Sequence, residues 1–369
     1  MEPIIKWPGG KERELVHILS NQPHGFDNYY EPFVGGGAVF MALEAKSYFI
    51  NDLSDELIGL YDCIKHLDSQ FFNYSEIINV SFESAKDFSN KHFETLCKSY
   101  LQYRNDIIDL EQLSTHINEF IAKNKNEVNA ICMFDKGNKF FLEELTSTLK
   151  RKMRRMKALE AQKGAMPTND LKANIETTIK SSLYVFYRYL YNTDNGHDRP
   201  LKLSLFFFLR NYAYSGMFRY NSEGLFNVPY GGIAYNNKLT RKKLKYYQSK
   251  TVQEKFARTI IGNLDFEEFL QRHQPSENDF VFLDPPYDTE FSTYAQHDFT
   301  KVDQQRLADY LTNRCNAKWM LIIKNTDFIY SLYANKSGIN ISSFDKEYTV
   351  SFMNRNDKQV THLIITNYV

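Results

Sequence analysis

The segment that most restricts the fold is the short apolar run from Phe280 to Leu283, which is followed by Asp284-Pro285-Pro286-Tyr287. A strand that is apolar at every position is buried on both faces, which is typical of a central strand in a parallel sheet. Proline has no N–H to donate, so the strand must end at the prolines. Parallel strands need long crossover connections, and the segment therefore predicts an α/β fold.

Residues 28–66 predict a nucleotide-binding type of βαβ unit, because a Gly-rich turn joins the first strand to a helix. The expected elements are strands at Asn28–Phe33 and Tyr48–Ile50, a helix at Ala38–Ala45 and a second helix that starts at Ser54.

The α/β pattern resumes after residue 258. Thr300-Lys301-Val302-Asp303 has the pattern of a capping box and predicts the start of a helix. Trp319–Ile323 is a second apolar run and predicts a buried strand. The segments Tyr348–Met353 and Val360–Tyr368 alternate around Asn354–Asp357, which favours a terminal hairpin at the sheet edge.

A length of 369 residues favours two domains. Residues 67–200 are rich in Lys, Asn, Ser and Glu, with a helical pattern and a loop expected at Gly164–Asn169. We therefore expect one α/β domain, formed by 1–62 and 236–369, that is interrupted by a mainly helical insert at 63–235. Within the insert, Lys150–Lys157 holds six basic residues in eight. This segment is either a solvated amphipathic helix or a helix that faces phosphates.

Composition excludes several classes of protein. Forty-five basic residues balance 45 acidic ones, which excludes a uniformly basic nucleic-acid coat but is compatible with a local basic face. The four cysteines lie far apart, without the spacing of metal ligands, so neither a metal site nor a disulfide framework is expected. Reduced cysteines fit the cytoplasm. No apolar run approaches the roughly 18 residues of a membrane span.

Asp284-Pro285-Pro286-Tyr287 carries the strongest chemical signal, since open α/β sheets bind ligands at the carboxyl ends of their strands. Asp284 supplies a carboxylate acceptor, Pro285 presents its carbonyl, and Tyr287 offers an aromatic face. Two acceptors beside a stacking plane suit an exocyclic amine on a planar base.

The Gly-rich turn suggests a nucleoside-like ligand. Glu31 to Gly37 reads EPFVGGG, and Asp52 ends the next strand near the position of an acid that binds ribose hydroxyls. Phe40 stands where the last glycine of G-x-G-x-x-G would be, which argues against a dinucleotide. Lys6 to Lys11 reads KWPGGK and predicts a loop with a tryptophan that could stack.

The motifs KWPGGK, EPFVGGG and DPPY, in this order, resemble those of the DNA adenine-N6 methyltransferases of the Dam-like alpha group. Residues 211–232, NYAYSGMFRYNSEGLFNVPYGG, are similar to the DNA-contacting hairpin of that family. The resemblance covers roughly 1–62 and 203–369. Lys324 stands where close relatives carry a small polar residue, and Gly232 stands where GATC-specific relatives carry a cation, so the recognition sequence stays open.

The resemblance implies a Rossmann-like methyltransferase sheet with a helical DNA-recognition insert, and methyl transfer to adenine N6 of a base flipped out of duplex DNA. It also implies S-adenosylmethionine as cofactor, a cytoplasmic or phage-infected-cell setting, and a possible cognate restriction endonuclease as partner. The implied catalytic residues are Asp284, Pro285, Pro286 and Tyr287, with Tyr287 stacking on the flipped adenine. The implied cofactor site consists of Trp7, Lys11, Phe33, Gly35, Gly37, Asp52, Asp265, Phe266 and Asp284. The implied DNA contacts are Lys6, Tyr214, Met217, Arg219, Asn221 and Pro229.

Three alternatives stay open on the residues alone. The same tetrapeptide would serve transfer to cytosine N4 or to a protein amide. A restriction endonuclease or a bifunctional fusion is disfavoured, because Asp170-Leu171-Lys172 lacks an upstream Pro-Asp partner. A non-catalytic DNA-binding module is disfavoured by the intact Asp284 and Gly-rich turn. No cysteine follows a proline, so the nucleophile of cytosine-C5 enzymes is absent from the sequence.

Overall fold

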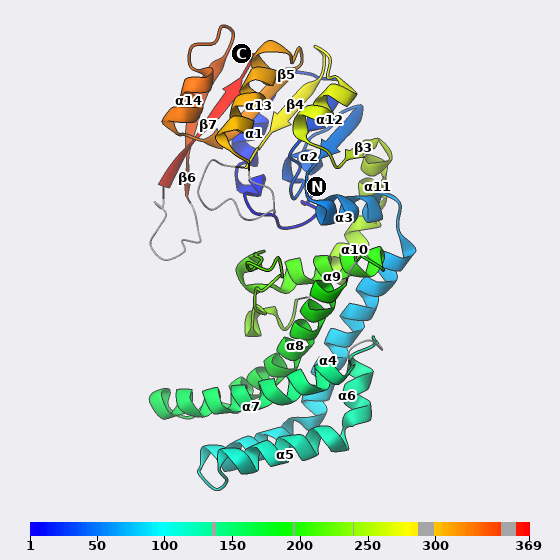
Figure 1. The fold of residues 1–369 in the computed structure, drawn as a ribbon, viewed down its shortest axis with the longest axis vertical. Coiled ribbons are helices and arrows are strands. Elements are labelled where there is room, and N and C mark those ends of the chain that lie inside the picture. The colour runs from blue at the N-terminus through cyan, green and yellow to red at the C-terminus, as the bar shows by residue number, and fades with distance from the viewer. Residues whose placement is uncertain (135–137, 195, 239, 287–298, 348–358) are drawn as a thin grey trace. The chain divides into compact units, whose positions relative to one another are not determined.

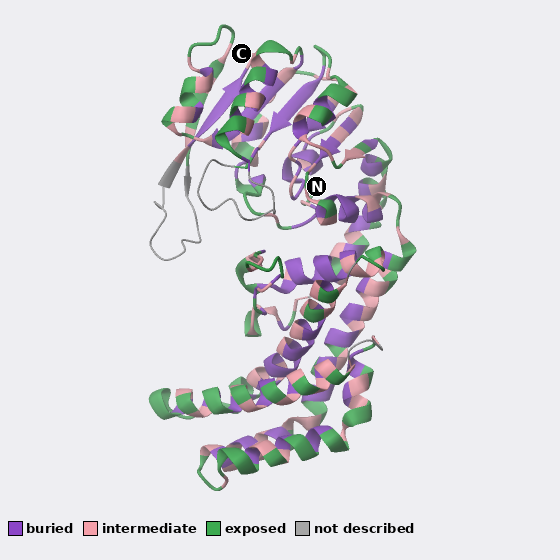
Figure 2. Ribbon diagram, in the orientation of Figure 1, coloured by how far each residue is buried: buried purple, intermediate pink, exposed green. Residues whose placement is uncertain are grey.

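A computed structural model describes residues 1–134, 138–194, 196–238, 240–286, 299–347 and 359–369 (Figure 1). The chain divides into two compact units. The first unit combines Met1–His66 with Tyr247–Val369, and the second is the continuous segment Leu67–Tyr246. Each unit has its own core, as the buried residues of each in Figure 2 show.

The first unit is built on a seven-stranded sheet with the order β3-β2-β1-β4-β5-β7-β6. The first five strands in this order are parallel, whereas β7 pairs antiparallel with β5 and with β6. The strands are β1 (Asn28–Glu31), β2 (Ser47–Asn51), β3 (Thr259–Gly262), β4 (Phe280–Leu283), β5 (Lys318–Lys324), β6 (Asn340–Glu347) and β7 (Gln359–Thr366). This mixed α/β sheet is the Rossmann-like fold that the sequence predicts.

Helices connect the strands and cover the sheet. They are η1 (Lys11–Arg13), α1 (Leu15–Ser20), α2 (Ala38–Ala42), α3 (Asp55–Lys65), α11 (Lys250–Ala257), α12 (Phe266–His273), α13 (Lys301–Asn313) and α14 (Asp327–Tyr333). Every residue of β4 is buried. Val281 and Leu283 pack into a cluster with residues of α12 and α13, while the alternating Phe280 and Phe282 point to the opposite face. Burial on both faces explains why the sequence of β4 is uniformly apolar.

Several boundaries of this unit confirm the sequence predictions. Ser54 caps α3 by accepting a hydrogen bond from the Leu57 amide, and Thr300 and Asp303 form the predicted capping box of α13. The helix expected at Ala38–Ala45 is shorter, because Leu43 is already extended. The Lys255 ammonium and the Tyr48 hydroxyl both donate to the Leu43 carbonyl, so tertiary contacts end the helix early.

The terminal hairpin lies at the sheet edge as predicted, but its first strand is Asn340–Glu347. The strand predicted at Tyr348–Met353 and the turn predicted at Asn354–Asp357 lie outside the described residues. Edge strands pair on one side only and tolerate polar residues, so β6 carries little hydrophobic signal.

The second unit is mainly helical, as predicted. Its helices are α4 (Ser69–Arg104), α5 (Leu110–Lys123), α6 (Lys125–Ile131), α7 (Asn138–Lys163), α8 (Thr168–Thr193), α9 (Arg199–Tyr212), η2 (Tyr214–Gly216), η3 (Ile233–Tyr235) and α10 (Arg241–Tyr247), the last of which ends at the boundary. The loop predicted at Gly164–Asn169 is shorter than expected, since α8 begins at Thr168 directly after Pro167.

Aromatic side chains form much of the core of the helical unit. Phe208 lies against Phe82, Tyr187 and Tyr212, with ring centroids between 4.7 and 5.2 Å apart. These rings join α4, α8 and α9. Among the described residues of the whole chain, no helix is long and apolar enough for a membrane span, and no group of His, Cys, Asp and Glu could hold a metal ion.

Candidate active site

The candidate site lies at the carboxyl ends of β1 and β4, which are neighbours in the centre of the sheet. From β1 the chain continues to β2 on one side, whereas from β4 it continues to β5 on the other. The connections therefore diverge at this point, and open α/β sheets bind ligands where that happens. The turn that starts at Pro32 follows β1, and Asp284 follows β4.

Asp284 forms an ion pair with Lys11, with 2.6 Å between Nζ of Lys11 and Oδ2 of Asp284. The side chain of Lys11 is 3% exposed and that of Asp284 is 18% exposed, so the pair is largely removed from water. Lys11 also donates to the Gly9 carbonyl, and its ammonium lies 3.9 Å from the Glu14 carboxylate. The loop of the KWPGGK motif thus holds one oxygen of Asp284, although the two residues are far apart in the sequence.

The two prolines after Asp284 differ in exposure. Pro285 is buried, whereas Pro286 is exposed and its carbonyl accepts a hydrogen bond from the buried side chain of Gln304 on α13. This bond anchors the segment that follows Asp284. Tyr287, the predicted stacking residue, lies outside the described residues.

The Gly-rich turn is closely packed against other parts of the chain. A Cβ on Gly36 would lie 2.3 Å from the Ile5 carbonyl oxygen, and one on Gly37 would lie 2.3 Å from the Tyr61 hydroxyl. Gly35 and Gly37 also have φ values of +48° and +73°, which disfavour other residues. The glycines therefore bring the turn against the N-terminal segment, and a Cβ on Gly35 would meet the ring of Trp7 at 2.9 Å.

Asp52 holds the same turn from the end of β2. Its two carboxylate oxygens accept hydrogen bonds from the amides of Gly35 and Ser54, each at 3.0 Å. Burial raises the pKa of Asp52, and these backbone bonds oppose that rise. A carboxylate oxygen can accept more than one hydrogen bond, so this geometry is compatible with hydroxyl donors from a ligand.

Three aromatic rings lie together beside the turn. Phe33 is half-buried, and its ring centroid is 5.6 Å from that of Phe266 and 5.5 Å from that of Phe299. Phe33 and Phe266 were predicted from the family motifs. Phe299 was missed, and the only sequence signal for it is its position just before the capping box of α13.

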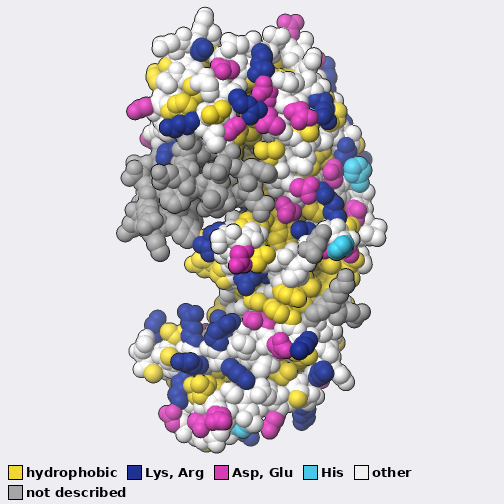
Figure 3. Space-filling view, viewed as in Figure 1, with side chains coloured by type: hydrophobic (Ala, Val, Ile, Leu, Met, Phe, Trp, Pro, Cys, Tyr) yellow, Lys and Arg dark blue, Asp and Glu magenta, His cyan; other side chains and the backbone are white. Residues whose placement is uncertain are grey.

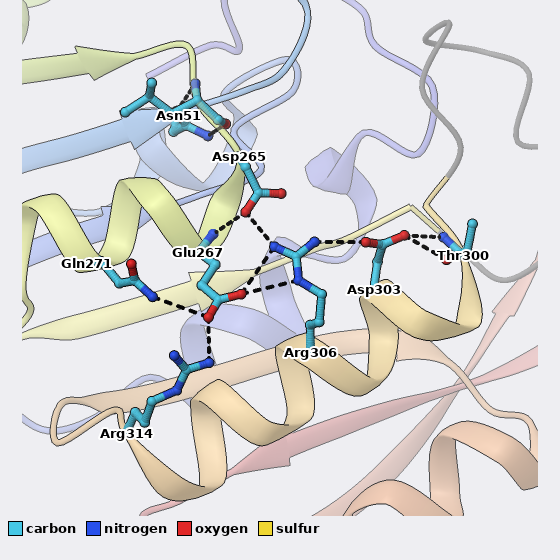
Figure 4. A network of polar contacts seen from close by, with 9 residues as sticks. Asn51, Asp265, Glu267, Gln271, Thr300, Asp303, Arg306 and Arg314 are labelled. Atoms are coloured by element: carbon cyan, nitrogen blue, oxygen red, sulfur yellow. Dashed lines mark hydrogen bonds and ion pairs between the residues drawn. The ribbon is translucent and has the colours of Figure 1, made fainter.

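Asp265 lies at the start of α12, next to these rings, in the polar network shown in Figure 4. Its carboxylate caps the helix by accepting from the Glu267 amide and pairs with Arg306 at 2.8 Å. Arg306 also pairs with Glu267 and Asp303, so one guanidinium fixes α12 against α13. Sequence reasoning predicted Asp265 but not Arg306, which no local pattern distinguishes from an ordinary surface arginine.

Glu31, at the end of β1, carries a further buried carboxyl group at this edge of the sheet. This side chain was not among the predicted site residues. Its side chain accepts a hydrogen bond of 2.9 Å from the Tyr29 hydroxyl. Burial raises the pKa of Glu31 well above its usual range, the Tyr29 bond opposes the rise, and the nearby charge of Asp284 adds to it. The Lys11–Asp284 pair therefore lies beside a carboxyl group that favours its neutral form.

The remaining predicted residues lie in segment 211–232 of the helical unit, except for Lys6, which is exposed in the N-terminal segment. Isolated bridges join Ala213 to Tyr230 and Tyr220 to Phe226, which confirms a hairpin turn around Asn221. We call residues 213–230 the hairpin. Its buried residues pack onto α8, where Tyr184 and Arg188 both donate to the Val228 carbonyl.

The predicted contact residues of the hairpin differ in exposure. Tyr214, Arg219 and Pro229 are exposed, and Met217 is half-buried. Arg219 donates through Nε to Asn227, and within the described residues its two terminal nitrogens have no hydrogen-bond partner. Asn221 closes the turn, because its side-chain oxygen accepts from the amides of Glu223 and Leu225.

Comparison with known proteins identifies matches over almost the whole chain. The family model of the D12 class N6 adenine-specific DNA methyltransferases matches residues 7–179 and 161–350. The type II methyltransferase M.CviBI of Paramecium bursaria Chlorella virus NC1A is 24% identical, with 100% of both chains covered. The type II methyltransferase M.MjaIII of Methanocaldococcus jannaschii is 25% identical over 100% of this chain and 99% of its own. The retron Ec67 DNA adenine methylase of Escherichia coli is 26% identical over 91% of this chain and 81% of its own.

Proposed function

The chain belongs to the D12 class of N6 adenine-specific DNA methyltransferases, and we propose that it takes the methyl group from S-adenosylmethionine bound at the carboxyl edge of the sheet. The observation that supports this most strongly is the Lys11–Asp284 pair at the point where the connections of β1 and β4 diverge. It joins two family motifs at the place where this type of sheet binds its ligands.

The residues around this point fit S-adenosylmethionine. The rings of Phe33, Phe266 and Phe299 offer an apolar surface for an adenine ring, and the carboxylate of Asp265 lies beside them as an acceptor for its amine. The carboxylate of Asp52, fixed by two backbone amides, suits ribose hydroxyls. Trp7, Lys11, Gly35 and Gly37 complete the proposed cofactor site.

Adenine N6 is a weak nucleophile, because its lone pair is delocalised into the ring. The sulfonium of the bound cofactor supplies an activated methyl group. Asp284 would accept a hydrogen bond from the N6 amine, as would the Pro285 carbonyl, and Lys11 would keep the carboxylate of Asp284 oriented. Pro286 would hold the segment rigid, and positioning of this kind supplies much of the rate.

The target base must leave the helical stack to reach such a site, at a cost of a few kcal/mol. We propose that Tyr287 stacks on the flipped adenine, as the family motif implies, and that Tyr214 enters the space left in the duplex. Arg219 would read a base edge, and Lys6, Met217, Asn221 and Pro229 would lie at further positions along the DNA. In this account 1–62 and 236–369 form the catalytic domain, and 63–235 forms the target-recognition domain.

Replacing Asp52 with alanine tests the cofactor site. Loss of a charged acceptor for a ribose hydroxyl should weaken S-adenosylmethionine binding by about 1.5–3 kcal/mol. Calorimetric titration of the wild type, Asp52→Ala and the exposed neighbour variant Asp55→Ala measures this difference. Equal affinity for all three proteins would remove Asp52 from the proposed site.

Replacing Arg219 with alanine tests the hairpin. Removing a bidentate interaction with a base should lower discrimination by about 1–3 kcal/mol at one base pair. Methylation rates on a target duplex and on its single-substitution versions measure the change. Arg219→Lys is the matched variant, because it keeps the charge and loses the planar fork. If Arg219→Ala instead weakened every duplex equally, Arg219 would be a phosphate contact.

M.CviBI and M.MjaIII are named as type II methyltransferases. We therefore propose that this enzyme protects DNA within a restriction–modification or phage modification system, with a cognate endonuclease as partner. A cytoplasmic location accords with such a role. DNA methylated by the enzyme should then resist one endonuclease that cuts the same sequence, and digestion of treated and untreated plasmid measures this.

A further inference from the structure

The exposed basic face of α7 has no role in the proposed active site or in the hairpin. Figure 3 shows Lys and Arg side chains gathered over this part of the helical unit. The segment contains Lys150, Arg151, Lys152, Arg154, Arg155 and Lys157, and no acidic residue occurs between Leu145 and Leu159. The whole chain has no net charge, so this concentration of positive charge is local.

The helix is fixed in the unit by its opposite side. Leu145, Leu149, Met153 and Met156 are all buried, and they recur at the spacing of one helical face. Arg151, Arg154 and Arg155 are exposed on the other side of the helix. The packing of α7 therefore determines which way these three guanidinium groups face.

Ion pairs do not neutralise all the cations on the exposed face of α7. Lys150 donates to the Asn118 side chain, Lys157 pairs with Asp106, and Arg151 lies 3.7 Å from the Glu144 carboxylate. Within the described residues, Arg154 and Arg155 have no carboxylate within ion-pair distance. Arg154 and Arg155 therefore lack the compensation that a solvated helix ordinarily has through i,i+4 pairs of opposite sign.

The arrangement instead places like charges next to each other. Lys150 and Arg154 are four positions apart, as are Arg151 and Arg155, and such like-charge pairs destabilise a helix. Burial lowers the pKa of Lys152, and the charges of Arg155 and Arg151 lower it further. The helix dipole favours cations mainly in the last turn, which lies beyond this segment. A bound polyanion would relieve the repulsion.

We propose that the face formed by Arg151, Arg154 and Arg155 binds the phosphate backbone of the substrate duplex, outside the sequence read by the hairpin. Arg151 and Arg155 are about 6 Å apart along the helix axis, which is on the scale of successive phosphates in one strand. α7 and the hairpin belong to the same unit, and α8 packs against both of them, as Figure 1 shows. The proposal rests on the proposed function, because it takes duplex DNA as the ligand.

The triple variant Arg151→Gln, Arg154→Gln and Arg155→Gln tests this proposal. Its affinity for a duplex that the enzyme methylates, and for one that it does not methylate, should fall by a similar factor, on the order of 10²-fold at 0.1 M salt. The slope of log K against log salt should decrease by about 0.9 for each phosphate that the variant no longer neutralises. Fluorescence anisotropy with labelled duplexes over a range of salt concentrations measures both quantities.

A matched control removes the same net charge from elsewhere. Lys46, Lys250 and Arg272 are exposed cations of the first unit, each paired with a carboxylate. Their triple replacement by Gln should leave affinity and salt slope close to those of the wild type. An equal loss in both triple variants would show an effect of overall charge and would overturn the proposal.

Failure of the α7 proposal can be distinguished from failure of the proposed methyltransferase function. Wild-type affinity and salt slope in the α7 variant, together with normal methylation, would overturn the α7 proposal and leave the methyltransferase assignment intact. A wild-type enzyme that methylates no DNA would instead contradict the proposed function. Circular dichroism checks that the triple variant folds. If it does not fold, the single variant Arg154→Gln replaces it. We expect Arg154→Gln to lower the slope of log K against log salt by about 0.9.

Discussion

Asp284→Ala is expected to abolish methyl transfer, with a loss of about 10³-fold or more in turnover. The variant removes the proposed acceptor of the N6 amine, and it also removes the partner of the buried Lys11 ammonium at 2.6 Å. DNA affinity should change little, because Asp284 lies in the first unit and the proposed duplex contacts lie mainly in the hairpin and α7. Single-turnover rates with labelled S-adenosylmethionine, measured beside DNA-binding assays, separate these effects.

Asp284→Asn is the matched variant. Asparagine has nearly the same volume and keeps one acceptor oxygen, but it loses the charge that pairs with Lys11. Its rate should lie between those of the wild type and Asp284→Ala. Turnover of Asp284→Ala within about tenfold of the wild type, a barrier change of only about 1.4 kcal/mol, would exclude Asp284 from the chemical step.

Lys11→Met is expected to lower both stability and turnover. Removing one partner of a buried ion pair costs about 3–5 kcal/mol, and the partial exposure of Asp284 places the expected loss near the lower end. Lys11→Met would also remove the cation that lies 3.9 Å from the buried Glu14 carboxylate. The midpoint and slope of urea unfolding, measured without ligand, report the stability change.

Lys46→Met provides the comparison for Lys11→Met. Lys46 pairs with Asp27 at 2.7 Å, almost the same distance as in the Lys11–Asp284 pair. The side chains of Lys46 and Asp27, however, are both well exposed. Exposed pairs of this kind contribute about 0–1 kcal/mol, so Lys46→Met should unfold near the wild-type midpoint. Similar losses in the two variants would mean that burial of the Lys11–Asp284 pair has no energetic consequence.

The fold was predictable where burial on two faces leaves a clear pattern. β4 and β5 are apolar at almost every position, and α13 starts with a capping box, so local sequence was sufficient for each. Local sequence was insufficient to predict β6, because this edge strand has a polar sequence. It was also insufficient to predict the end of α2, which depends on contacts from Lys255 and Tyr48. Both features depend on tertiary context.

The candidate site shows the same limit. Asp284, Asp52 and the Gly-rich turn could be identified because each follows a strand within a recognisable motif. The pairing of Lys11 with Asp284, the support of Asp265 by Arg306 and the contact of Phe299 with Phe33 join distant segments. Such contacts depend on strand order, which no local pattern specifies.

The most direct test of the central claim is mass spectrometry of nucleosides from duplex DNA incubated with the enzyme and S-adenosylmethionine that carries a deuterated methyl group. We predict that the wild type forms N6-methyldeoxyadenosine with the deuterated methyl group and that Asp284→Ala does not. Labelled N4-methyldeoxycytidine as the sole product, or unmethylated DNA from an enzyme with confirmed cofactor binding, would contradict it.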